Sequence, residues 1–126
     1  MGTVTIASFG YLHGDPPPAH LLIDLRHHFR DPHVSPELRH MTADDEPVRT
    51  TVLNTPGIVD LVAATAAAVN AFAAGPSAGL LAIADGCAGG RHRAPAFAQA
   101  LADRLTAEGH TVTVHHRDLH RPVVNR

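Results

Sequence analysis

Four short, mostly apolar runs, separated by longer segments, limit this chain to a small set of folds. They cover residues 4–7, 21–25, 80–84 and 112–114. Runs that are continuously apolar, rather than alternating with polar residues, are typical of strands in a sheet that is covered on both faces. Because only 4% of the residues are aromatic, aliphatic side chains must build most of the core.

Two segments between these runs have helical periodicity, because apolar residues recur in them every three or four positions. The first, over about 58–74, follows Thr55, which suits an N-cap, and precedes Gly75-Pro76, which suits a helix end. The second, over about 95–108, stops at Gly109. Both segments are therefore predicted to be helices.

The strand, helix and strand over residues 80–114 form a βαβ unit, which is expected to be a right-handed parallel crossover. We therefore predict an α/β fold: one domain over residues 1–126, with a single doubly wound, mostly parallel sheet of about four strands and flanking helices. Residues 27–46 are polar, histidine-rich and interrupted by prolines. They predict a long irregular excursion of the kind that often carries a function.

Charge and cysteine content narrow the function. All ten basic residues are arginine, and the formal net charge is −2, which argues against strong non-specific binding to nucleic acid. The planar arginine side chain nevertheless suits bidentate contact with phosphate. The single cysteine excludes an internal disulfide. Because the chain has neither a signal-peptide pattern nor an apolar run of about 18 residues, we expect a cytoplasmic protein without a membrane span.

A glycine-rich segment, residues 86–93, follows the third apolar run and leads into the second predicted helix. Glycines let the backbone curl so that several N–H groups face one anion, and the helix N-terminus adds its dipole. Potential cations lie in the same segment. We therefore predict a phosphate-binding loop, with a plain strand-to-helix turn as the alternative. Its residues are Gly86, Cys87, Ala88, Gly89, Gly90, Arg91, His92 and Arg93.

Cys87 and Arg93 have the spacing of the phosphate-binding loop of cysteine-dependent phosphatases, in which a thiolate attacks phosphorus. Such a loop normally has Ser or Thr after the arginine, where this chain has Ala94. We therefore expect a buried, inert cysteine and no catalytic residue, and phosphatase activity is the third hypothesis.

A second cluster follows the second apolar run. It contains Asp24, Arg26 and His33. Ligands of open parallel sheets bind beyond the carboxyl ends of the strands, where Asp24 is expected. Its carboxylate could accept hydrogen bonds from sugar hydroxyls or an amine, or could pair with Arg26 or Arg93 and only order the loop. The histidines lack a compact ligand pattern, so no metal site is predicted.

A third cluster follows the last apolar run and contains His116, Arg117 and Arg121. It is either a solvated basic edge or a contact for phosphate or RNA backbone.

These segments together resemble one known family, the C-terminal domain of the RNase adapter RapZ and its relatives. The resemblance runs in order over nearly the whole chain, and the glycine–cysteine segment is its most specific part. The matching motifs are Ser8-Phe9-Gly10, Ile23-Asp24-Leu25-Arg26, Asp31-Pro32-His33, Pro36-Glu37-Leu38-Arg39, Thr42-Ala43-Asp44-Asp45, residues 86–93 and His116-Arg117-Asp118.

The resemblance implies a fold like a subdomain of phosphofructokinase. It also implies the properties of the enterobacterial members, which sense glucosamine-6-phosphate, bind small regulatory RNAs and oligomerise. The implied ligand site comprises His33, Ala88, Gly89 and Arg93, with Gly90, Arg91 and His92 beside them. Candidate contacts to RNA or a protein partner are Arg39, His116, Arg117 and Arg121.

Full-length relatives begin with a P-loop nucleotide-binding domain. This chain has no Gly-x-x-x-x-Gly-Lys-Ser/Thr motif, so ATP or GTP hydrolysis is not expected of it. The family threonine of the glycine loop is Ala88 here, which removes one hydroxyl contact to phosphate.

We expect a non-catalytic regulatory domain that binds a phosphorylated small molecule such as glucosamine-6-phosphate, without a cofactor. An RNA-binding adapter is the alternative. RNA, a protein or a second copy of the chain are candidate partners.

Overall fold

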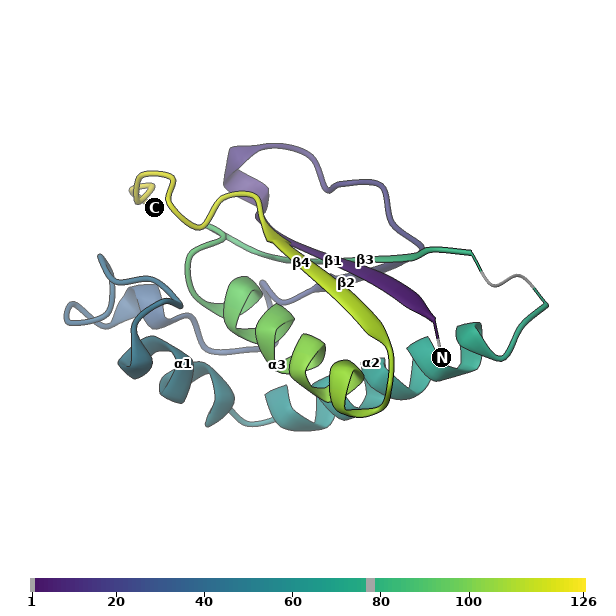
Figure 1. Cartoon of the computed structure of the whole chain (residues 1–126). Helices are drawn as coiled ribbons and strands as arrows, with labels where there is room; N and C mark the ends of the chain where they lie inside the picture. The colour runs from purple at the N-terminus through teal and green to yellow at the C-terminus, as the bar shows by residue number, and fades with distance from the viewer. Residues whose placement is uncertain (1, 77–78) are drawn as a thin grey trace.

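Four parallel strands form a twisted sheet in the order β2-β3-β1-β4, as seen in a computed structural model that describes residues 2–76 and 79–126 (Figure 1). The strands are β1 (Thr3–Gly10), β2 (Leu21–Asp24), β3 (Leu81–Cys87) and β4 (Thr111–His116). The helices are α1 (Glu46–Leu53), α2 (Ile58–Ala73) and α3 (Arg93–Ala107), with 3-10 turns η1 (Tyr11–His13) and η2 (Pro32–Val34). The predicted α/β fold with four parallel strands is confirmed.

The central strands β1 and β3 supply the sheet side of the core. Ile6 pairs with Ile83 on one side and with Val114 on the other, so these three side chains share one face. Ile6 and Ile83 are buried against the helical layer. Successive side chains of a strand point to opposite faces of the sheet, so Val4 lies on the same face as Ile6. The aliphatic core that the composition required therefore lies between this face and the helices.

The helices cover one face of the sheet, whereas the sequence favoured cover on both. Figure 1 shows α1, α2 and α3 on one side and the loop over residues 11–20 on the other. The outward face of the central strands carries small side chains such as Thr5, Ala7 and Ala82, and its one large central side chain, Phe9, is covered by Tyr11. Small outward side chains need little cover, so a loop replaces the second helical layer.

Two helix starts differ from the sequence-based expectation. Helix α2 begins after Gly57, whose φ of +91° is left-handed, whereas the hydroxyl of Thr55 donates to the Thr51 carbonyl at 2.9 Å. Helix α1 was not predicted, because it is short and rich in β-branched residues. It forms because Val48 and Val52 are fully buried, so tertiary packing outweighs weak helical propensity.

No single helix in the described ranges is long and apolar enough to cross a membrane. Helices α1 and α2 reach the required length only as a pair bent by 79°.

Asp85 is a polar residue in the core. It pairs with Ser8 of β1 and Ile23 of β2, on the same face of β3 as Ile83. The residue is fully buried, and neither carboxylate oxygen has a hydrogen-bond partner among the described residues. Burial therefore raises the pKa of Asp85 well above its usual value. The folded state disfavours the charged form of Asp85. The free energy of unfolding is therefore higher at low pH, where Asp85 is protonated, and it falls as the pH rises above the pKa of the unfolded chain, about 4.

Substitution of Asp85→Asn should therefore stabilise the protein at pH 7, by about 1–3 kcal/mol. The gain should nearly vanish at about pH 3, where the carboxyl is largely protonated in the unfolded chain as well. Urea unfolding at both pH values measures the difference. The exposed Asp15→Asn is the matched control and should show no such pH dependence. An equal effect at both pH values would contradict an ionisation penalty.

Candidate functional site

The glycine-rich segment connects the end of β3 to the start of α3, as the sequence predicted, but its glycines have different reasons to be there. A Cβ on Gly86 would lie 2.7 Å from the Tyr11 ring and still closer to Phe9. Gly90 has a φ of +77°, and a Cβ there would lie 2.7 Å from the Gly10 nitrogen. Gly86 and Gly90 are therefore required by packing and backbone conformation.

Gly89 is different. A Cβ added to it would meet nothing within 4 Å, and its φ lies outside the left-handed region. Neither local conformation nor packing explains its lack of a side chain. The open space lies at the carboxyl end of β3 and before the start of α3, where α/β folds bind ligands.

Cys87 lies beneath this loop. Its Sγ accepts hydrogen bonds from the backbone N–H groups of Gly90 at 3.3 Å and Ala94 at 3.4 Å. The residue is 2% exposed, and burial raises the pKa of its thiol despite the lowering effects of these N–H groups and of Arg93. A neutral, buried thiol is a poor nucleophile. The geometry thus favours the predicted buried cysteine over a catalytic thiolate.

Arg93 organises the segment that follows β2. It is 3% exposed, and its Nη1 donates to the carbonyl oxygens of Leu25 at 3.0 Å, Arg26 at 3.1 Å and Phe29 at 3.0 Å. Its Nη2 lies 3.1 Å from Asp31 Oδ2. The sequence predicted that Arg93 would fork a phosphate. In the structure its two terminal nitrogens contact four protein oxygens and so fix the wall of the site, while its buried Nε–H has no acceptor among the described residues. The contact of Arg93 with a phosphate stays a prediction.

Arg91 joins three segments around the same loop. Its Nη1 donates to the Arg121 carbonyl at 2.8 Å, and its Nη2 donates to the His40 carbonyl at 2.9 Å. Its backbone carbonyl accepts from the N–H of Ala43 at 2.9 Å. The Arg91 Nε–H is buried and has no acceptor in the described part of the chain. This donor is therefore unsatisfied within the described part of the chain.

Two histidines have fixed or perturbed rings. His92 Nε2 lies 2.8 Å from the Met41 carbonyl, which can only accept, so Nε2 carries the hydrogen. Burial lowers the pKa of His92, so its ring is neutral at pH 7 and its Nδ1 is an acceptor. Burial, and next the positive charge of Arg126, lower the pKa of His33. His33 lies in η2, which is capped by Asp31: the Asp31 Oδ1 accepts a hydrogen bond from the His33 backbone N–H at 3.0 Å.

A small pocket joins these groups. Its remaining volume is about 10 Å³. It is lined by Asp31, His33, Cys87, Gly89, Arg91, His92, Val123, Val124 and Arg126. Five of these residues were predicted from the sequence. Asp31 was recognised only as part of a motif, and the contribution of residues 123–126 was missed, because nothing in their composition indicates where an irregular segment lies.

Asp24 and Arg26, in contrast, pair with each other. Arg26 Nη2 donates to Asp24 Oδ2 at 2.7 Å, and the guanidinium carbon lies 3.5 Å above the centre of the Tyr11 ring. The hydrogen bonds from Arg26 lower the pKa of Asp24. Of the two roles left open for Asp24, the structure contains the loop-ordering pair, and neither residue lines the small pocket.

The cluster after β4 is also engaged within the chain. The Gly10 N–H donates to Asp118 Oδ2 at 2.8 Å, and Arg117 Nε donates to the same oxygen at 3.0 Å. Arg117 Nη1 donates to the Asp15 carbonyl at 2.6 Å. Ser8 Oγ lies 2.7 Å from His116 Nδ1. This cluster therefore fixes the end of β1 against the glycine loop.

The two remaining candidate partner contacts, Arg39 and Arg121, have protein partners too. Arg39 Nε donates to the His33 carbonyl at 2.9 Å, and Arg121 Nε lies 3.1 Å from Asp118 Oδ1. Among the described residues there is no group of three or more side chains suited to hold a metal.

Residues 2–120 match the family model of the RapZ C-terminal domain. The chain belongs to this family. Similar proteins include a nucleotide-binding protein of Thermobifida fusca, 40% identical over 119 residues, which cover 92% of this chain and 40% of that protein. A nucleotide-binding protein of Streptomyces coelicolor is 40% identical over 120 residues, covering 93% of this chain and 40% of that protein. One of Frankia alni is 42% identical over 120 residues, covering 93% and 41%.

The recognition made from the motifs is thus confirmed. The RapZ C-terminal domain spans about two fifths of the length of these relatives, so their names describe much larger proteins. The family match includes the whole glycine loop and ends before residues 122–126.

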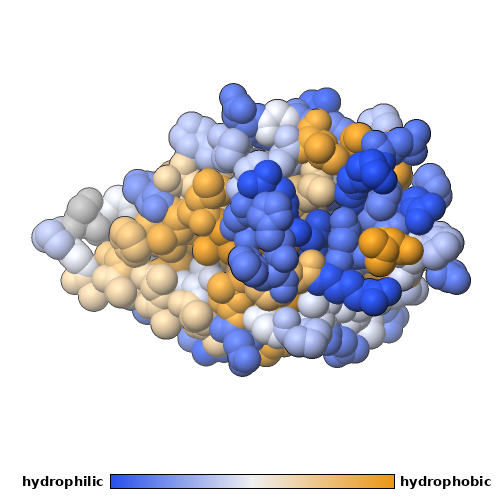
Figure 2. All heavy atoms as spheres, turned by 180° about the vertical axis from the view of Figure 1, so that it is seen from behind, coloured by the Kyte–Doolittle hydropathy of each residue, from blue (hydrophilic) through white to orange (hydrophobic). Residues whose placement is uncertain are grey.

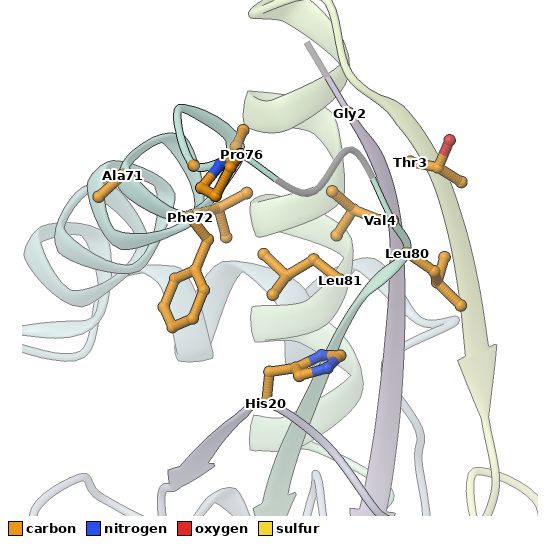
Figure 3. Close-up of a pocket in the computed structure, with 13 residues that line it drawn as sticks. Gly2, Thr3, Val4, His20, Ala71, Phe72, Pro76, Leu80 and Leu81 are labelled. Carbon is orange, nitrogen blue, oxygen red and sulfur yellow. The ribbon is translucent and has the colours of Figure 1, made fainter.

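A larger cavity, of about 400 Å³, lies at the amino ends of β1 and β3 in this RapZ-family domain, whereas the small pocket lies at the carboxyl end of β3 (Figure 3). Phe72, Leu80 and Leu81 line it, and His20, its one ionisable lining side chain, accepts the Ala82 N–H at 2.9 Å through Nδ1. In the view from behind, hydrophobic residues gather toward one end of the molecule and hydrophilic ones toward the other (Figure 2). The apolar cavity lacks the convergent polar groups of the small pocket, which we take as the candidate site.

Substitution Gly86→Ala should destabilise the domain by about 1–3 kcal/mol, because the new methyl group would overlap the Phe9 and Tyr11 rings. The same change at Gly89 should leave the free energy of unfolding nearly unchanged, because the methyl group would enter open space. Urea unfolding of both variants compares them directly. Similar losses of stability would contradict this division of the glycines.

Substitution Arg93→Ala should destabilise the domain by about 3–5 kcal/mol, because it leaves buried carbonyl groups and Asp31 without their partner. The exposed Arg30→Ala is the matched control and should have little effect. Thermal unfolding followed by circular dichroism measures both. A stable, folded Arg93→Ala protein would show that the guanidinium does not hold the 25–31 segment.

Proposed function

We propose that this RapZ-family domain is a non-catalytic regulatory domain that binds a phosphorylated small molecule, with an amino-sugar phosphate such as glucosamine-6-phosphate as its ligand. The observation that carries the proposal is the pairing of an open glycine with an unused donor. Gly89 has free space above its Cα, and Arg91, which lines the same pocket, has a buried Nε–H without an acceptor in the described residues.

A phosphoryl group suits this position chemically. It brings several strong acceptor oxygens and negative charge, and it would lie near the N-terminus of α3, where the helix dipole favours an anion. Arg91 supplies positive charge and the orphan donor. Backbone contact at Gly89 requires no side-chain hydroxyl, so the replacement of the family threonine by Ala88 is compatible with it.

The other side of the pocket suits a hydroxylated or amino-bearing ring. The Asp31 carboxylate already accepts a hydrogen bond from the guanidinium of Arg126 at 2.8 Å. An ammonium group of the ligand could take the place of this guanidinium. The neutral His92 offers an acceptor at Nδ1, and His33 lines the same pocket. In this proposal Asp31 takes the role of sugar contact that the sequence suggested for Asp24.

Calorimetric titration tests the proposal. The full chain should bind glucosamine-6-phosphate saturably, whereas glucosamine and inorganic phosphate should each bind much more weakly, because each provides half of the contacts. Gly89→Ala should weaken binding by at least about tenfold, since the methyl group takes ligand space.

Gly2→Ala is the matched control for that variant. Gly2 lies far along the chain from the glycine loop, and a Cβ there would make only ordinary contacts, with His110 at 3.8 Å and Ala73 at 3.9 Å. Binding should be unchanged. A Gly89→Ala protein with full affinity would move the ligand away from this pocket.

A further inference from the structure

Residues 122–126 lie across the small pocket. Val123 and Val124 line it together with Gly89 and Cys87, and Arg126 closes its Asp31 side. The volume that remains, about 10 Å³, is enough for roughly one water molecule. A phosphorylated sugar is far larger, so the pocket cannot hold one while this segment is in place.

The segment is firmly attached only at its start. The Arg121 carbonyl accepts from Arg91 at 2.8 Å, and the Arg121 N–H donates to the Asp118 carbonyl at 3.1 Å. Beyond Arg121, one ion pair, between Arg126 Nη2 and Asp31 Oδ2 at 2.8 Å, is the only polar contact of residues 122–126 within the described chain. Both partners are partly exposed, at 23% and 22%, and such a pair contributes little to stability.

In this ion pair, Arg126 also imitates the cationic group of the ligand that the pocket is proposed to bind. Arg126 places a cation on the Asp31 carboxylate, where an amino sugar would place its ammonium group. Asp31 keeps its second partner, Arg93, whether or not Arg126 is present, because Arg93 approaches at 3.1 Å from the buried side. Exchange of Arg126 for a ligand cation therefore leaves the wall of the pocket intact.

We propose that residues 122–126 are a displaceable autoinhibitory cover, in which Arg126 occupies the cation position of the ligand and must leave Asp31 before a ligand can bind. The identity of the ligand rests on the proposed function, whereas the existence of the cover does not. Apparent affinity is then reduced by the fraction of molecules in which the cover is closed.

The single cysteine provides a test that needs no ligand. Cys87 lines the pocket beneath Val123 and Val124 and is 2% exposed. We would compare the rate at which a soluble disulfide reagent modifies it in the full chain and in a chain shortened after Arg121. Removal of the cover should expose the thiol and raise the rate by at least about tenfold.

Arg126→Gln should raise the rate in the same direction by a smaller factor, because it removes the ion pair and keeps the valines. The exposed Arg30→Gln is the charge-matched control and should not change it. Circular dichroism checks that each variant is folded; the removed residues lie outside the family match over 2–120. Equal rates of Cys87 modification in the full and shortened chains would overturn the proposal that residues 122–126 are a cover.

Titration of glucosamine-6-phosphate into the same two chains separates the two proposals. Tighter binding to the shortened chain, together with faster modification of Cys87, supports both. Faster modification without binding to either chain supports the cover and contradicts the proposed ligand. Weaker binding to the shortened chain would overturn the cover, because it would make residues 122–126 part of the binding surface.

Discussion

The candidate site depends on the guanidinium of Arg93. This side chain starts at the first turn of α3, donates to three carbonyl groups between residues 25 and 29 and pairs with the Asp31 carboxylate. An irregular segment has no internal ladder of hydrogen bonds, so it needs such external donors to take one conformation. Asp31 and His33 reach the pocket because Arg93 fixes the chain that precedes them.

A second set of contacts fixes the loop from the other side. Asp118 is fully buried and binds the Gly10 N–H, and Gly10 in turn packs against the backbone of Gly89 and Gly90. Burial would raise the pKa of Asp118, but hydrogen bonds from Arg117 and Gly10 lower it, so the carboxylate stays charged at neutral pH. The buried Asp118 thus positions the glycine loop through Gly10, while Arg93, the last residue of the loop, holds the 25–31 segment, and neither side chain is hydrogen-bonded to Gly89 within the described residues.

The sequence predicted the parallel sheet, two of the three helices and the position of the glycine loop, because apolar periodicity and glycine spacing are local signals. It assigned Arg93 to the ligand, which stays a prediction, and it did not indicate the carbonyl groups that the guanidinium contacts, because residue type and spacing do not show which way a side chain points. It also left Asp24 with two roles, and only the folded chain shows the pair with Arg26. Helix α1 and the position of residues 122–126 depend on tertiary contacts, for which the sequence has no simple pattern.

The position of β1 in the sheet has a consequence for how the chain acquires its structure. This first strand is central, and its residue Val4 pairs with Leu81 and with Val112, while no hairpin joins any two of the four described strands. On the ribosome, β1 therefore emerges long before either of its neighbours, because β3 ends at residue 87 and β4 at residue 116. Contacts so distant in sequence make folding slow and leave an apolar strand exposed to aggregation in the meantime. The sheet is in this sense assembled only after β4 has been synthesised, and the glycine loop, which needs Gly10 and Asp118 at once, is completed last.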